Sequence, residues 1–567
     1  MSLDISFRPK LADTIKGYTR QNFVSDAIAG VIVAIVALPL AMAFGIASGV
    51  TPSAGIITSI IAGLIVSFLG GSRVQIGGPT GAFVGIVVGI ITVYGLENLY
   101  ICTILAGIIL VILGVTRMGS LIKFIPYPVT MGFTSGIAVI IFSTQVKDFF
   151  GLQVDKVPAD FVGKLRVLFE NLGAINWINL ALAIASIAVI KTWPAKWGKK
   201  VPGSIVALVA GTLIVTLLKL QVETIGSRFG GIPTSFPPIH FPKLEWQNIQ
   251  HLFAPAFTIA MLAAIESLLS AVVSDGMIDD RHDSNQELIA HGFANIVCPL
   301  FGGIPATGAI ARTATNVRSG GRTPVAGIVK SLTVLAIVML AGKLAKYVPL
   351  AVLSAILVVV AFNMGEWGQF RRLNRWPKGD SLVFLTVFAL TVLADLRQAV
   401  EIGMVLAAGL FVHRISETTQ VEALRENNDA EDLNNSLAGK HIPAGVLVYR
   451  LFGAFLFGAA DKLESTLNRS NQEPEVLILK MQNVLAMDAT GLNALEDIYE
   501  KLHQRRSQLI LSGPHTQPLA MMVKTGFVDR IGEENVCAHL DASLERARQI
   551  IAAKSAGAKS PDPTAGQ

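Results

Sequence analysis

The chain changes from polar to strongly apolar near residue 26 and stays apolar to about residue 414. A helix that crosses a bilayer needs about 20 mostly apolar residues, so the pattern predicts a membrane region of fourteen segments. These segments are residues 26–46, 54–70, 79–93, 99–116, 128–147, 175–192, 203–220, 254–275, 286–299, 305–318, 323–343, 349–364, 380–395 and 397–413. Two of them, 79–93 and 305–318, are too short or too rich in glycine to be simple crossings.

A different pattern follows the apolar region. Residues 1–25 are expected to form a cytosolic N-terminal segment, residues 26–414 the transmembrane domain, and the acidic residues 415–440 a cytosolic linker. Residues 441–553 alternate between β-like and amphipathic helical runs, which predicts a small α/β domain, and residues 554–567 have the composition of a disordered tail. Strands are expected at 445–457, 476–481 and 509–512, and helices at 490–505, 518–526 and 540–553.

The composition also indicates a membrane protein. Hydrophobic residues make up 52% of the 567 residues and charged residues only 15%, whereas a soluble domain has about 25% charged residues. A soluble chain of this length would need far more polar surface. The three scattered cysteines exclude a disulfide scaffold and are typical of soluble parts that face a reducing cytosol.

The distribution of lysine and arginine predicts the orientation. Residues 1–22 lack the apolar core of a signal peptide, so the N-terminus is expected in the cytosol. An even number of crossings then places the C-terminal domain there too, and most basic residues fall on the cytosolic side. We therefore expect a multi-pass protein of the inner (plasma) membrane. The few basic residues expected on the opposite side are Lys147, Lys219, Arg228 and Lys343.

Two places break the helical pattern inside the membrane region, at residues 76–83 (IGGPTGAF) and 302–309 (GGIPATGA). Each has glycines followed by a proline at the start of a short helix, where the missing N–H of proline costs no hydrogen bond. Non-helical backbone at membrane depth is tolerated only where it is buried in protein or lines a cavity. Matching interruptions in two halves are typical of transporters with inverted repeats.

Short helices that begin at mid-membrane direct their free N–H groups and positive ends toward one place, which favours an anion. The sequence thus predicts an anion site between two half-helices. An alternative is that these glycines only allow close helix packing.

Two charged residues lie deep in apolar segments. A charge at the bilayer centre costs at least about 2.5–3.5 kcal/mol on insertion scales, so Glu266 and Arg312 require a partner, water or a function. Arg312 would supply fixed positive charge near the anion, and Glu266 would bind a proton or cation. The alternative is a structural ion pair between the two. Five other charged residues are expected at the membrane interface: Asp275, Glu287, Lys330, Asp395 and Arg397.

The stretches at 37–49, 70–83, 263–271 and 305–327 resemble the sulfate permease family of anion transporters, and the C-terminal domain resembles the STAS domain fused to them. The resemblance implies fourteen segments in two inverted repeats of seven, with a core subdomain that moves against a gate subdomain like an elevator. It implies an anion site formed by the following residues of the first span and the two half-helices: Pro39, Leu40, Phe44, Ala82, Phe83, Ala309, Ile310, Ala311 and Arg312. It places Glu266 and Ser270 on the eighth span, at the coupling-ion site.

The chain departs from the family pattern at several positions. Many relatives have glutamine where this chain has Leu40, and serines where it has Ala309 and Ala311, which leaves more of the anion binding to backbone amides. Glu266, in place of the aspartate of sodium-coupled relatives, favours proton coupling. In the STAS domain, Ala489 occupies the place of the serine that is phosphorylated in soluble proteins of this fold, so support of assembly is favoured over a phosphoswitch. Phosphorylation of the neighbouring Thr490 is the alternative.

No catalytic, metal-binding or phosphate-loop motif is apparent, so no enzyme activity, cofactor, metal or nucleic-acid partner is expected. The leading hypothesis is a secondary active importer of a small anion, with sulfate first, coupled to a proton or cation. Sodium-coupled bicarbonate transport, dicarboxylate transport and an uncoupled channel-like carrier are the alternatives. A membrane-tethered sensor is a third class. The habit of the family implies a homodimer.

Overall fold

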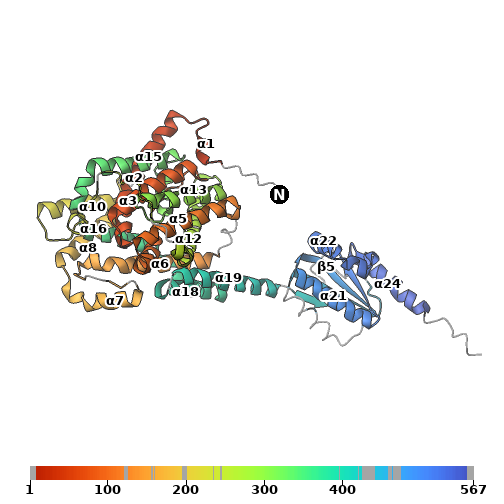
Figure 1. The fold of residues 1–567 in the computed structure, drawn as a ribbon. Coiled ribbons are helices and arrows are strands. Elements are labelled where there is room, and N and C mark those ends of the chain that lie inside the picture. The colour runs from red at the N-terminus through yellow and green to blue at the C-terminus, as the bar shows by residue number, and fades with distance from the viewer. Residues whose placement is uncertain are drawn as a thin grey trace, which may run out of the picture. The chain divides into compact units, whose positions relative to one another are not determined.

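The structure is a computed structural model that describes residues 8–119, 126–154, 157–158, 160–194, 201–233, 235–242, 246–394, 396–418, 420–423, 441–456, 463 and 474–557. It divides into two compact units, Met1–Ala407 and Ala408–Gln567. The first is helical and the second combines a sheet with helices (Figure 1). The border between the units lies within a helix, a few residues before the predicted border at residue 414. The predicted domain boundaries stay predictions.

Every apolar segment predicted from the sequence coincides with a helix. The helices are α2 (Arg20–Ala47), α3 (Pro52–Leu69), α4 (Phe83–Tyr94), α5 (Leu96–Val115), α6 (Tyr127–Phe150), α8 (Trp177–Thr192), α10 (Gly203–Leu217), α12 (Trp246–Ile278), α13 (Ser284–Val297), α14 (Ile310–Arg318), α15 (Val325–Ala341), α16 (Leu350–Met364), α18 (Lys378–Leu393) and α19 (Leu396–Thr418). Among the described residues, six helices are long and apolar enough to cross a membrane: α2, α3, α5, α6, α12 and α15. The number of crossings stays a prediction.

Short elements connect these helices. They are α1 (Lys10–Thr14), α7 (Phe161–Glu170), α11 (Ile225–Phe229), α17 (Trp367–Phe370), η2 (Leu172–Ala174), η3 (Cys298–Phe301), η4 (Gly342–Tyr347) and η5 (Leu373–Arg375). Two two-residue strands, β1 (Gly77–Gly78) and β2 (Thr307–Gly308), precede α4 and α14 and form their own sheet.

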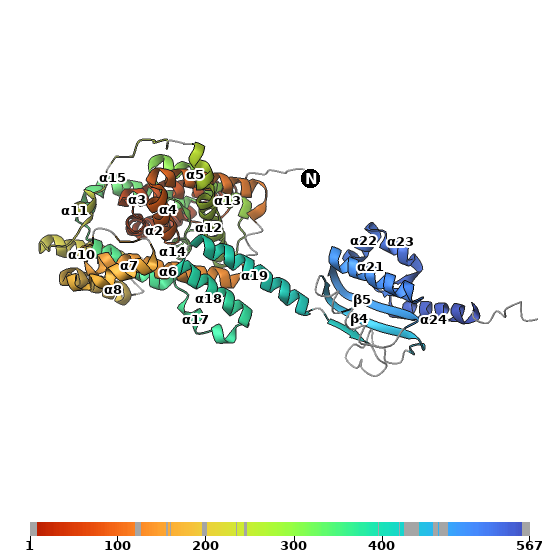
Figure 2. The ribbon, with the colours of Figure 1, turned by 60° about the horizontal axis from the view of Figure 1, so that its bottom comes forward.

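The helix packing repeats between the two halves of the membrane unit. Helix α2 packs against α15, and its counterpart α12 packs against α5. Likewise α3 with α15 corresponds to α13 with α5, and α8 with α16 corresponds to α6 with α18. Each contact therefore recurs with the halves exchanged, as expected of inverted repeats. Figure 2 shows α14 beside α2 and α12 in the interior of this unit.

The helices fall into two bundles by their contacts. The first bundle contains α2, α3, α4, α5, α12, α13, α14 and α15, and the second contains α6, α8, α10, α16 and α18. Glycines allow close approach within the first bundle, as small residues do in membranes. A Cβ on Gly55 would lie 1.9 Å from the carbonyl oxygen of Ala41, and a Cβ on Gly107 would lie 2.6 Å from that of Gly292.

The C-terminal unit is an α/β domain, as predicted. Its sheet has the order β3 (Gln420–Ala423), β4 (Val446–Phe455), β5 (Val476–Met487), β6 (Gln508–Ser512) and β7 (Val536–Cys537). Only β3 with β4 is antiparallel. The helices are α21 (Ala489–Gln504), α22 (Thr516–Lys524), α23 (Phe527–Ile531) and α24 (Leu540–Gly557), with η6 (Glu533–Asn535) before β7. Leu495 and Phe527 belong to the core cluster on one face of the sheet, and Leu544 belongs to that on the other face.

Several predicted strand and helix bounds differ from those of the structure. Strand β5 continues to Met487 instead of ending at residue 481, because its last residues still pair with β4. Strand β3 and the end of α19 lie within the predicted linker 415–440, and residues 424–440 lie outside the described residues. Helix α24 extends past residue 553 to Gly557, and the rest of the predicted tail, 558–567, lies outside the described residues, as do residues 1–7.

The glycine contacts predict opposite effects of one substitution at two sites. Gly55→Ala should lower the melting temperature of the detergent-solubilised protein, because its Cβ would overlap the Ala41 carbonyl and overpacking costs about 1–3 kcal/mol. Gly89→Ala in α4 is the control, since nothing lies within 4 Å of its Cβ; it should leave the melting temperature unchanged or raise it. Equal melting temperatures for the two variants would contradict this packing.

Candidate anion-binding site

The two broken segments meet in the structure. Gly77 and Gly78 of β1 pair antiparallel with Gly308 and Thr307 of β2. Next to this pair, the N–H of Ala309 donates to the carbonyl of Ile76 at 3.0 Å. The extended backbone of each segment therefore satisfies that of the other, which explains how both persist at membrane depth. The alternative that these glycines serve only helix packing does not describe this arrangement.

Side chains hold the paired segments in place. The Thr307 hydroxyl donates to the Ala263 carbonyl at 3.0 Å, and Gln75 Nε2 donates to the Ser267 carbonyl at 2.9 Å, so α12 anchors both segments. Asn295 of α13 bonds both backbone groups of Ala306 at 2.8 Å. Each of these side chains is buried. The loops before the half-helices are therefore fixed by hydrogen bonds that apolar side chains could not supply.

Each half-helix follows one of the paired strands: α14 begins two residues after β2, and α4 begins five residues after β1. The N-cap residues are Ala82 for α4 and Ala309 for α14, and neither accepts a hydrogen bond with its side chain. The first-turn N–H groups of a helix have no partner within the helix. In α4 the N–H groups of Phe83 and Val84 donate to the carbonyls of Thr80 and Gly81 at 3.4 and 3.1 Å, whereas those of Ile310 and Ala311 in α14 have no partner among the described residues. The free N–H donors therefore lie on α14, and the positive dipole ends of both helices lie near the β pair.

Arg312 connects the two half-helices. It lies in the first turn of α14 and is 3% exposed, and its Nη2 donates to the carbonyl of Pro79 in front of α4. Its Nη1 is buried and has no hydrogen-bond partner in the described structure. A Cβ on Gly78 would lie 2.6 Å from this nitrogen, so glycine is required where the guanidinium passes the strand. The site therefore holds a fixed positive charge with one donor group unused.

Glu266 lies beside the first half-helix instead of pairing with Arg312. Its Oε2 accepts a hydrogen bond from the Thr80 hydroxyl at 3.0 Å. Both Glu266 and Arg312 are described, and no ion pair within 4 Å joins them. The structural ion pair considered above is therefore not formed. The carboxylate is tied to the turn that leads into α4, next to the predicted anion site.

The other predicted substrate residues are divided between buried and exposed positions. Phe44 of α2 is buried, and a Cβ on Gly81 would lie 3.2 Å from its ring. Ala82, Phe83 and Ala309 are buried as well, whereas Ile310 is 43% exposed and Ala311 is exposed. The first turn of α14 is thus partly open.

Two of the remaining predicted residues, Leu40 and Pro39, lie within α2, and the third, Ser270, supports the strands before the half-helices. Leu40 packs against an apolar cluster of the second bundle, and Pro39 is buried within α2. Ser270 is buried, and its hydroxyl donates to Gln75 Oε1 at 3.0 Å and lies 3.3 Å from the Thr313 hydroxyl. The structure therefore places Ser270 in the network that holds the strands.

The expectation that Lys330 and Glu287 lie at the membrane interface was wrong. Lys330 is fully buried, and its Nζ donates to Ser59 Oγ at 2.8 Å, to the Ser59 carbonyl at 2.6 Å and to the Gly77 carbonyl at 3.4 Å. Glu287 is also fully buried and accepts from the N–H groups of Gly71 and Ser72 at 2.8 and 3.0 Å. Both residues are near the ends of their predicted segments, but other parts of the protein enclose their side chains.

Lys330 is a residue of the site that the sequence reasoning missed. It places an amine behind β1, and its hydrogen bond to Gly77 fixes that strand from the side opposite β2. The signal was a single lysine in an otherwise apolar helix, which by itself indicates a function or a partner. Three other charged residues were expected at the membrane interface. Asp275 bonds the His282 ring at 2.6 Å, while Asp395 and the Arg397 side chain lie outside the described residues.

Comparisons with known proteins agree with this architecture. Residues 23–387 match the model of the sulfate permease family, and residues 440–547 match that of the STAS domain. YvdB of Bacillus subtilis, a provisionally assigned sulfate transporter, is 41% identical over 94% of this chain and 99% of its own length. The bicarbonate transporter BicA of Picosynechococcus sp. is 30% identical over 93% of this chain and 95% of its own.

Two solved structures show the same fold. The transmembrane domain of a cyanobacterial bicarbonate transporter BicA matches with a TM-score of 0.63 at 31% identity, covering 68% of this chain and 98% of that chain. SLC26A9 matches with a TM-score of 0.85 at 17% identity, covering 96% of this chain and 93% of that chain. The predicted fold class is therefore confirmed.

A bulky side chain at the open N-terminal end of α14 is expected to block anion binding. Ala309→Phe should abolish the high-affinity binding of the transported anion, because a bulky side chain at the N-cap would fill the space in front of the free N–H groups; Gly81→Phe should act similarly at the other half-helix. The measurement is equilibrium binding of radiolabelled sulfate to the purified protein. Ala336→Phe, on the exposed face of α15, is the control and should bind normally. Normal affinity in both site variants would remove the half-helices from the anion site.

Proposed function

Since the chain belongs to the sulfate permease family of anion transporters and carries a STAS domain, we propose that it imports a small anion by secondary active transport. Sulfate is the first candidate. The relatives are named for sulfate and for bicarbonate transport, and both are small oxyanions.

The observation that carries this proposal is the paired half-helix arrangement. Two uncapped helix ends and the unused Nη1 of Arg312 are next to one β pair. A small anion would accept from the first-turn N–H groups of α14 and from Nη1, and its charge would be balanced by the dipoles of both helices and the guanidinium. Phe44, Ala82, Phe83, Ala309, Ile310 and Ala311 would form the rest of the site.

Glu266 supplies a means of coupling. An unprotonated carboxylate near the site repels an anion, whereas a protonated or sodium-bound carboxylate does not. Binding of the cation and binding of the anion would therefore favour each other, and this coupling is reciprocal. Ser270, one helical turn from Glu266 on α12, would complete the coupling site through Gln75 and Thr313.

The two bundles provide the parts for an elevator-like motion. Both half-helices, Glu266 and Arg312 belong to the first bundle. Leu40 of that bundle contacts a cluster of the second bundle that includes Leu182, Val352 and Ile356, so this part of the contact is apolar. Apolar contacts are not directional, so the first bundle could slide without breaking hydrogen bonds there. We propose that it carries the anion past the second bundle.

Membrane placement and assembly complete the proposal. The apolar helices indicate a multi-pass membrane protein. We propose the inner (plasma) membrane, with both termini in the cytosol, and a homodimer supported by the STAS domain. In that domain, Ala489 is the first residue of α21, and Asp488 caps the helix by accepting from the Gly491 N–H at 2.8 Å.

Uptake into proteoliposomes identifies the transported anion. Labelled sulfate, bicarbonate and succinate are each supplied with and without an inward proton or sodium gradient. We expect gradient-driven sulfate accumulation above equilibrium. If only bicarbonate accumulates, and only with a sodium gradient, this chain would be a bicarbonate transporter like its BicA relatives. Flux that never exceeds equilibrium would contradict secondary active transport, and binding without flux would indicate a sensor.

A substitution at Glu266 tests the coupling role. Glu266→Gln should remove the acid stimulation or cation dependence of uptake while preserving the fold, because the amide oxygen can still accept from Thr80. The measurement is the initial rate of uptake as a function of pH and sodium. Glu170→Gln makes the same change at an exposed carboxylate and serves as control. Unchanged pH and sodium profiles in Glu266→Gln would exclude Glu266 from coupling.

A further inference from the structure

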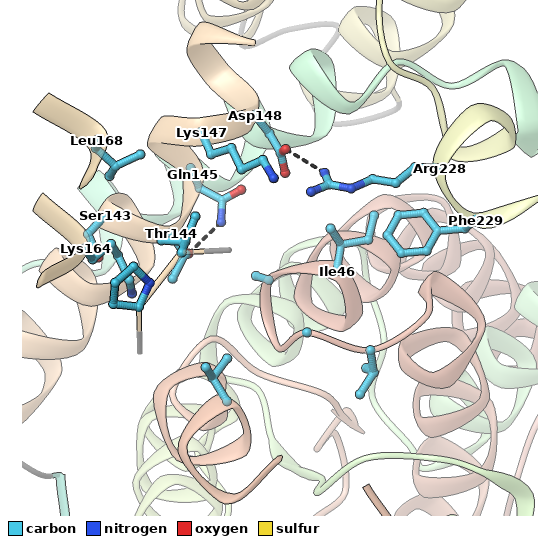
Figure 3. Close-up of a pocket in the computed structure, with 16 residues that line it drawn as sticks. Ile46, Ser143, Thr144, Gln145, Lys147, Asp148, Lys164, Leu168, Arg228 and Phe229 are labelled. Carbon is cyan, nitrogen blue, oxygen red and sulfur yellow. Dashed lines mark hydrogen bonds and ion pairs between the residues drawn. The ribbon is translucent and has the colours of Figure 1, made fainter. Parts of the chain in front are cut away.

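A cavity of about 340 Å³ lies next to the anion site but is lined by none of its residues (Figure 3). It is bounded by the C-terminal ends of α2 and α6, by α7 and by α11, and it reaches Val88 on α4. Val88 is five residues beyond Phe83, which corresponds to about 7.5 Å along a helix. The cavity is thus a short distance from the half-helix site, at the end of α2 remote from the N-terminus. Its volume falls within the range typical of small-molecule sites.

Positive charge dominates the cavity. Its ionisable side chains are Lys147, Asp148, Lys164 and Arg228, three cations against one carboxylate. Arg228 pairs with Asp148 at 2.7 Å, and Lys147 donates to the Val154 carbonyl. Figure 3 shows Lys147, Asp148 and Arg228 along one side of the opening and Lys164 on the other. Arg228 also lies 3.8 Å from Glu223, so the excess positive charge of the lining comes from Lys147 and Lys164.

Lys164 is the cation of this lining without a hydrogen-bonded partner among the described residues, and Asp160 is the carboxylate that acts on it at longer range. Lys164 is 6% exposed, and its ammonium has no hydrogen bond or ion pair with any described residue. Burial lowers its pKa, and the nearby Asp160 opposes that effect only in part. A buried ammonium without a partner is costly, and an anion beside it would remove that cost. Ser143 and Gln145, both buried, line the same cavity and add polar groups.

We propose that this cavity binds a small tetrahedral oxyanion at Lys164, as a second site separate from the one between the half-helices. Lys147 and Arg228 raise the local anion concentration, and Lys164 donates to the bound oxyanion. We further propose that the anion moves from this cavity to the half-helix site. That transfer rests on the proposed function, whereas the binding itself does not. With the N-terminus cytosolic, the cavity faces the side from which an imported anion arrives.

Equilibrium binding of radiolabelled sulfate to the full-length protein tests the second site. In the Ala309→Phe background, where the half-helix site is blocked, one weaker site should remain, and Lys164→Met should weaken it by roughly tenfold or more, since a hydrogen bond to a charged group is lost. Lys164→Arg keeps the charge and should restore binding. Lys343→Met, which removes an exposed charge on η4, should have no effect. Lys164→Met binding that equals its parent would overturn the proposal.

The same measurement in the parent protein covers the case in which Ala309→Phe does not fold. There, Lys164→Met should remove only the weaker component of a two-site isotherm. Loss of both components or of neither would overturn a separate site.

Nanodiscs distinguish a free anion from a lipid headgroup, which offers the same phosphate chemistry. Sulfate affinity at the weaker site should be equal in phosphatidylcholine discs with and without phosphatidylglycerol. Competition by phosphatidylglycerol that Lys164→Met abolishes would assign the cavity to a lipid and overturn the proposal.

Transport separates this proposal from the proposed function. Lys164→Met should raise the apparent KM for sulfate uptake several-fold with kcat unchanged, and more so at low ionic strength, where charges are least screened. If the parent protein moves no sulfate, the proposed function fails for that anion, while the binding measurements still decide the second site. An unchanged KM in an active transporter would overturn the handing-over role.

Discussion

The structure depends on one constraint: polar backbone groups inside a membrane must be satisfied by the protein itself. The chain breaks two helices at membrane depth, and the pairing of Gly77–Gly78 with Thr307–Gly308 satisfies the backbone that these breaks expose. Neither half of the chain could do this alone. The antiparallel pair also brings the starts of α4 and α14 together, so the contact that removes the backbone cost is the same contact that would build the proposed anion site.

The buried charges follow from this arrangement. Arg312 reaches the carbonyl of Pro79 on the opposite half-helix segment, and Lys330 reaches that of Gly77. Both side chains therefore satisfy carbonyl groups in the segment where β1 leads toward α4. Glu266 is held near them by Thr80 without forming an ion pair. The Arg312 guanidinium held in this way makes the site electropositive before any ligand arrives, which reduces the reorganisation that anion binding requires.

The sequence predicted the membrane segments, the two breaks and the α/β domain because each has a local signal: apolar length, a Gly-Pro motif, or alternating runs. It did not predict the register of β1 with β2, since that pairing joins residues from opposite halves. Lys330 and Glu287 were misplaced because closeness to a segment end resembles an interface, whereas their partners Ser59 and Gly71 come from distant parts of the chain. Strand β3 was missed because it is short and lies in an acidic stretch, where only β4 pairs with it.

The most direct measurement of the central claim is an experimental structure with selenate, an oxyanion whose selenium scatters anomalously. An anomalous peak should lie between the first turns of α4 and α14, within hydrogen-bond distance of Arg312 Nη1. A protein that transports selenate but shows no peak there, while binding it elsewhere in the membrane unit, would contradict the account.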